Sequence, residues 1–119
     1  MPTFFIAIVR DAVTRSALAS HAAAGFGDMV KAVVDVQRGV MAIGAEVHAD
    51  EEAALLEDGS RQTDLWGINL YPADPGDAWV EFDSMINIRP AQGNRSRSVD
   101  DPAIQVAIRR VVATLVSGA

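Results

Sequence analysis

Five polar side chains are predicted to share one face of a β-hairpin, and they are the groups in this chain best suited to ligand chemistry. Residues 65–71 and 79–89 alternate between apolar and polar side chains, as half-buried strands do. The proline- and aspartate-rich segment 72–78 between them is typical of a turn. If Leu70 lies opposite Val80, the apolar side chains of Trp66, Ile68, Leu70, Val80 and Phe82 fall on one face. The other face then carries Asn69, Glu81, Asp83, Asn87 and Arg89.

This polar face predicts a binding site for a small anionic or polar ligand. Gly67 is expected opposite Asp83, where the missing side chain would leave open space. Glu81 and Asp83 are spaced so that they can also act as an acid and a base. The alternative is an ordinary solvated sheet surface, on which Arg89 pairs with a carboxylate.

The loop at residues 92–97 follows the second strand and adds basic groups at the rim of this face. It contains glycine, amide and hydroxyl side chains and two guanidinium groups, a combination that suits phosphate or carboxylate. We therefore add Asn94, Arg95 and Arg97 to the ligand-binding candidates. In the alternative interpretation Asp100 and Asp101 hold the arginines, and the loop is purely structural. The loop matches no Walker or dinucleotide-binding fingerprint.

Three potential metal ligands, Glu46, His48 and Asp50, occupy alternating positions. In an extended segment they project to one side, where they can hold a divalent metal ion. This pattern supports an alternative function, a metal-assisted hydrolase with His48, Glu81 and Asp83 as catalytic candidates. Asp50 also suits the N-cap of a helix over residues 51–57. Nothing in the sequence requires a cofactor, and the absence of cysteine and of a nucleophile elbow argues against covalent catalysis.

The composition limits the class of protein. The chain has 119 residues, half of them hydrophobic, which predicts one domain over residues 1–119 with a real core. The net charge of −6 argues against nucleic acid or an acidic membrane as the partner. The apolar run at residues 4–9 has no basic start and is short, so we expect neither a signal peptide nor a membrane span. Together with the lack of cysteine, this fits a cytoplasmic protein.

A third possible function is a homo- or hetero-oligomeric interaction module that pairs through sheet edges.

The remaining elements predict an α+β fold. We expect a buried strand at residues 3–9 and a helix that starts at Thr14 or Ser16 and ends before Gly25. Residues 30–43 fit two strands, 30–36 and 40–43, or one helix. Asp101 and Pro102 begin the clearest helix, whose apolar stripe consists of Ile104, Ile108, Val111, Val112 and Leu115. We expect a mainly antiparallel sheet with two or three helices packed on one face.

Four segments, residues 29–36, 46–50, 64–72 and 81–97, resemble a family of small, uncharacterised prokaryotic proteins. The resemblance covers residues 26–116. It implies no particular reaction, but its characteristic segments coincide with the predicted polar face and rim. The resemblance therefore favours a functional site there.

Overall fold

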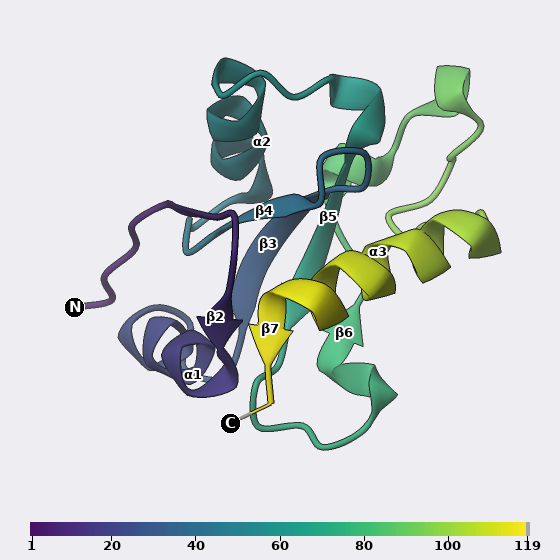
Figure 1. Cartoon of the computed structure of the whole chain (residues 1–119). Helices are drawn as coiled ribbons and strands as arrows, with labels where there is room; N and C mark the ends of the chain where they lie inside the picture. Colours follow the sequence, from purple (N-terminus) through teal and green to yellow (C-terminus); the bar gives the residue numbers. More distant parts are fainter. Residues whose placement is uncertain (119) are drawn as a thin grey trace.

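A computed structural model describes residues 1–118, and its centre is a five-stranded antiparallel sheet (Figure 1). The strands lie in the order β1-β4-β3-β5-β6. Their bounds are β1 (Ala7–Val9), β3 (Val30–Asp35), β4 (Val40–Ile43), β5 (Leu65–Leu70) and β6 (Val80–Glu81). Two short strands, β2 (Val13–Thr14) and β7 (Val116–Ser117), pair in parallel beside this sheet. The α+β prediction is confirmed.

Three α-helices cover the sheet: α1 (Arg15–Ala24), α2 (His48–Glu57) and α3 (Pro102–Leu115). The larger core packs α1 and α3 against one face of the sheet, and α3 runs across the strands (Figure 1). Leu55 of α2 packs with Val33 and Leu65 in a separate cluster on the other face. The prediction of helices on one face therefore holds for α1 and α3, and α2 departs from it. On the α2 face, Val33 of β3 and Val40 and Ala42 of β4 are apolar, and α2 covers them.

The ends of α1 and α3 follow local sequence signals. The Thr14 side chain accepts a hydrogen bond from the Ala17 amide at 2.9 Å, and the Asp101 side chain accepts one from the Ala103 amide at 2.9 Å. These bonds satisfy amides that a helix start leaves unpaired. The predicted stripe of α3 packs into the larger core. Within residues 1–118, no helix combines the length and apolar character needed to cross a membrane.

Residues 30–43 form the hairpin of β3 and β4, which resolves the choice between two strands and one helix. The buried side chain of Asp35 organises the turn, because its Oδ1 accepts from the amides of Gln37 and Arg38 at 2.9 and 2.8 Å. Gly39 completes the turn with φ of +69°, a conformation that suits glycine.

Two predicted element starts were wrong. The first strand begins at Ala7, and Phe5 and Ile6 before it are 55% and 42% exposed. Helix α2 begins at His48 with Val47 as its N-cap residue, and no side chain caps it. Asp50 lies in the first turn of α2 and does not cap it.

The β5–β6 hairpin has the predicted register, with Leu70 opposite Val80 and Asn69 opposite Glu81. The predicted strand 79–89 was nevertheless too long, since β6 ends at Glu81. The chain then enters a 3₁₀ turn at Met85–Asn87, in which the Ser84 hydroxyl accepts from the Ile86 amide at 3.3 Å. Ile86 consequently packs with the α2 cluster instead of the larger core.

Candidate functional site

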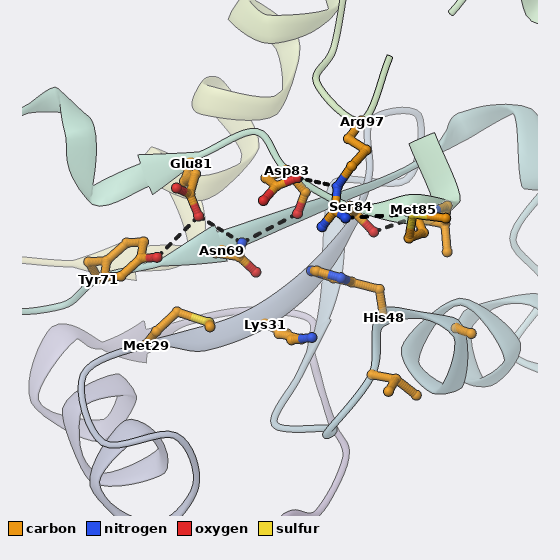
Figure 2. A pocket seen from close by; sticks show the side chains of 13 residues that line it. Met29, Lys31, His48, Asn69, Tyr71, Glu81, Asp83, Ser84, Met85 and Arg97 are labelled. Carbon is orange, nitrogen blue, oxygen red and sulfur yellow. Dashed lines mark hydrogen bonds and ion pairs between the residues drawn. The ribbon is translucent and has the colours of Figure 1, made fainter. Parts of the chain in front are cut away.

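A pocket of about 580 Å³ opens on the face of the sheet that carries α2 (Figure 2). Its floor is a row of three side chains, one from each of three neighbouring strands. Lys31 of β3 is the register partner of Asn69 of β5, which in turn is the partner of Glu81 of β6. The start of α2 and the segment after β6 form its walls. The sheet register thus places an amide between a cation and an anion.

The Asn69 side chain links this floor to the wall. Its Nδ2 donates to Glu81 Oε1 at 2.8 Å and to the Asp83 carbonyl at 3.3 Å. Because these partners only accept, the amide oxygen must face the other way. Figure 2 shows this oxygen pointing into the space bounded by Lys31 and His48. Asn69 is only 6% exposed, and its Oδ1 has no hydrogen-bond partner among residues 1–118. The pocket therefore contains a buried acceptor that no described residue satisfies at hydrogen-bond geometry, although His48 lies close enough to interact with Asn69.

Glu81 receives a second neutral donor at the same oxygen. The Tyr71 hydroxyl donates to Glu81 Oε1 at 3.1 Å. The pKa of Tyr71 is raised, mainly by burial and next by this hydrogen bond. The hydroxyl therefore stays protonated and remains a donor at neutral pH. Within the described part of the chain, no cation pairs with Glu81.

Lys31 is the only lysine of the chain, and it lies on the pocket floor. Its ammonium group makes no ion pair within residues 1–118 and lies 5.2 Å from the centroid of the Phe26 ring. Val47 and Ala49, at the uncapped start of α2, line the same pocket. The partial positive charge of a helix N-terminus adds to that of the ammonium group.

His48 contributes a neutral ring to the wall. Its Nε2 lies 2.8 Å from the Ile68 carbonyl oxygen, and because a carbonyl only accepts, Nε2 carries the hydrogen. Burial is the main cause that lowers the pKa of His48, and the charge of Lys31 lowers it further. At neutral pH the ring is therefore uncharged, with the lone pair on Nδ1.

Asp83 and Arg97 close one side of the pocket with an ion pair of 2.6 Å between Asp83 Oδ1 and Arg97 Nε. Arg97 also contacts the Met85 sulfur at 3.6 Å. Both charged side chains are about half exposed, at 43% and 55%, so the pair adds only about 0–1 kcal/mol to stability. Asp83 therefore already neutralises the positive charge of Arg97.

The open space predicted beside Gly67 does not exist, because Ser84 fills it. A Cβ atom on Gly67 would lie 2.5 Å from both Cβ and Oγ of Ser84. Asn87 is fully buried behind this contact, and its side chain pairs with the backbone of Gly67. Asn87 therefore lies outside the pocket, in contrast to the predicted polar face.

Arg89 also lies elsewhere. Its guanidinium group stacks 4.3 Å from the centroid of the Trp66 ring and donates to the carbonyls of Gln62 and Leu65. It borders a different, shallower hollow, whereas Asp83 lines the pocket. The expected grouping of Asp83 with Arg89 was wrong, because Arg89 satisfies backbone carbonyls at the other end of β5.

The loop at residues 92–97 binds an anion from its own chain. Asp100 accepts from the Arg95 amide at 3.0 Å and from the Ser96 hydroxyl at 2.5 Å, and these bonds lower the pKa of Asp100. Asn94 is buried and donates to the carbonyls of Asn87, Ser96 and Ser98. The structural alternative thus describes this loop, although Asp100 holds its amide and hydroxyl groups and not its arginines. Of the three rim candidates, only Arg97 lines the pocket.

The predicted metal ligands do not converge. Since His48 starts a helix, the extended spacing of Glu46, His48 and Asp50 is lost, and only His48 lines the pocket. Residues 1–118 contain no group of three or more histidine or acidic side chains arranged to hold a metal ion.

Lys31 and Tyr71, two of the pocket residues that the argument uses most, were not among the sequence candidates. The only sequence signal at Lys31 was a lone lysine in a run of valines. Its position beside Asn69 depends on the pairing of β3 with β5, which no local pattern specifies.

Comparison with known proteins gives a family match. A family model described as a protein of unknown function (DUF5674) matches residues 7–115, which agrees with the resemblance seen in the sequence. No curated protein and no solved structure matches the chain.

Proposed function

Because this chain belongs to the DUF5674 family of proteins of unknown function, we propose its function from the pocket: it binds a small polar ligand that carries an anionic group. The anionic group lies at Lys31 and the start of α2. The pocket volume of about 580 Å³ suits a metabolite-sized molecule.

The observation that carries this proposal is the unpaired ammonium group of Lys31 on the pocket floor. The other pocket cation, Arg97, is already paired with Asp83. His48 is neutral at neutral pH, so it adds no competing charge. An anionic group that reaches Lys31 would gain a charge-assisted hydrogen bond without breaking a protein ion pair.

The start of α2 supports the same position for the anion. Val47 supplies no side-chain cap, so the first amides of the helix have no side-chain acceptor. Residues 47–49 line the pocket, so the start of α2 borders it. Backbone amides at a helix N-terminus favour a carboxylate or phosphate oxygen.

Thermal unfolding with acetate, succinate, inorganic phosphate and L-leucine, each at constant ionic strength, tests this proposal. At least one of these anion-bearing probes should raise the Tm of the wild type, and Lys31→Met should lose that shift. Arg110→Met removes one positive charge from an exposed position on α3, outside the pocket, and should keep the shift. Equal stabilisation of Lys31→Met and wild type would contradict the proposal.

A further inference from the structure

Building on the proposed function, we propose that the ligand is a small zwitterion of the α-amino acid type with an apolar side chain. Its carboxylate binds Lys31, and its ammonium group binds Glu81 and Asn69. The pocket floor offers one unpaired charge of each sign and a buried acceptor between them.

The first argument is the spacing of the two charges. Lys31 and Glu81 lie in one row on adjacent positions of three strands, with Asn69 between them. Two strand spacings of about 4.8 Å separate their backbones by about 10 Å. Both side chains are long and flexible, yet they form no ion pair across Asn69 within residues 1–118. A ligand with both charges fits between them.

The second argument is the state of Glu81. Its two donors, Asn69 Nδ2 and the Tyr71 hydroxyl, both bind Oε1 and both are neutral. Oε2 receives no hydrogen bond from the described residues, and the negative charge has no cationic partner there. An ammonium group would supply both the charge and the donors.

The third argument is the buried Oδ1 of Asn69. This oxygen is the only acceptor of the side-chain amide, and it has no partner among residues 1–118. An ammonium group has three donors, so it can bind Glu81 and Asn69 at the same time. A carboxylate ligand without an amine would leave the Glu81 carboxylate and Asn69 Oδ1 without a donor. An amine without a carboxylate would place a second positive charge near Lys31 and leave Lys31 without an anionic partner.

The rest of the lining indicates the ligand's side chain. Apolar groups of Val47 and Ile86 line the pocket, and so do Met29 and Met85, which lie on opposite sides of it in Figure 2. Flexible methionine side chains adapt to differently shaped apolar groups. Leucine and methionine are therefore suitable probes, and each has the two charges close together.

Isothermal titration calorimetry of the full chain with three related compounds separates the contributions of the ligand's amine and carboxylate to the affinity. The probes are L-leucine, 4-methylpentanoate, which lacks the amine, and 3-methylbutylamine, which lacks the carboxylate. L-leucine should bind at least tenfold more tightly than either analogue. Glu81→Gln keeps an acceptor for Asn69 and Tyr71 but removes the charge, so it should weaken L-leucine about tenfold and leave 4-methylpentanoate unchanged.

The outcomes distinguish this inference from the proposed function. Suppose that L-leucine and 4-methylpentanoate bind with equal affinity and that Lys31→Met loses both. This result would overturn the inference of a zwitterionic ligand but would still support an anion site at Lys31. The inference would also be overturned if Glu81→Gln bound L-leucine as tightly as the wild type does. If neither carboxylate binds and no anion raises the Tm, both proposals fail.

Discussion

The side-chain amide of Asn87 pairs with the backbone of Gly67 in the way that a neighbouring strand would. The Gly67 amide donates to Asn87 Oδ1 at 2.8 Å, and Asn87 Nδ2 donates to the Gly67 carbonyl at 2.9 Å. This pair of bonds begins where β6 has ended at Glu81. Asn87 Nδ2 also donates to the Arg97 carbonyl at 3.0 Å. One buried side chain thus replaces strand pairing and holds the segment that carries Arg97 beside the pocket.

Asn87→Ala should therefore destabilise the fold. It leaves the amide and carbonyl of Gly67 without partners in a buried position, at a cost of about 1–3 kcal/mol for each group. We expect the free energy of unfolding in urea to fall by about 3 kcal/mol or more. Gln105→Ala removes one side-chain bond to a backbone carbonyl at a partly exposed site and should cost less. A loss no larger than that of Gln105→Ala would contradict this role of Asn87.

Gly67→Ala should destabilise the fold for a steric reason. The added Cβ would lie 2.5 Å from Cβ and Oγ of Ser84, so one segment must move at a cost of about 1–3 kcal/mol. Ser84→Gly removes both atoms, and the double variant should recover part of the stability lost by Gly67→Ala. A double-mutant cycle with strictly additive effects would show that the contact is not the cause.

The protonation of His48 should make the fold less stable in mild acid. Burial lowers the pKa of His48 in the folded state below its ordinary value of 6.5. Between these two pKa values the unfolded chain binds more protons, so the free energy of unfolding falls as the pH drops below 6.5. His48→Gln should flatten this part of the pH profile, measured by urea unfolding between pH 7.5 and 5. His21→Gln replaces the other histidine and should keep the wild-type slope. Parallel profiles for wild type and His48→Gln would contradict the assignment.

Glu51 should have the opposite pH dependence. Its side chain is fully buried, and burial raises its pKa well above 4.5 although the Ala45 amide donates to Oε2 at 3.0 Å. Because the folded state holds the proton more tightly, this stabilising contribution is complete below pH 4.5 and is lost as the pH rises through the folded pKa. Glu51→Gln should therefore gain stability relative to wild type as the pH increases towards 8. Glu57→Gln, at an exposed position on the same helix, is the control. A constant difference between Glu51→Gln and wild type over this range would refute the prediction.

Local sequence signals predicted the elements whose stability is also local. Asp101 and Pro102 started α3, and the alternation of β5 with β6 gave the correct register at Asn69 and Glu81. The same alternation failed beyond Glu81, since the Asn87 side chain took over the bonds of a backbone strand. In the sequence, a buried asparagine that replaces a strand looks the same as a polar residue on a strand surface.

The pocket could be predicted only in part, because it depends on pairing between distant strands. The hairpin register placed Asn69 and Glu81 together, and both line the pocket. Lys31 joins them only through the long-range pairing of β3 with β5. The sequence pattern singled out His48 for metal chemistry. Its place in the pocket wall instead follows from where α2 begins, and Val47 gives no N-cap signal from which that start could be predicted.

The single lysine allows the most direct test of the central claim, that an anionic group binds at Lys31. Protein labelled with 13C at lysine Cε gives one lysine signal, since Lys31 is the only source. We expect that signal to shift saturably when L-leucine is added, less strongly with 4-methylpentanoate, and not at all with 3-methylbutylamine. A signal that stays in place while L-leucine or any other anion-bearing probe raises the Tm would show that the anion binds elsewhere, and would contradict the account.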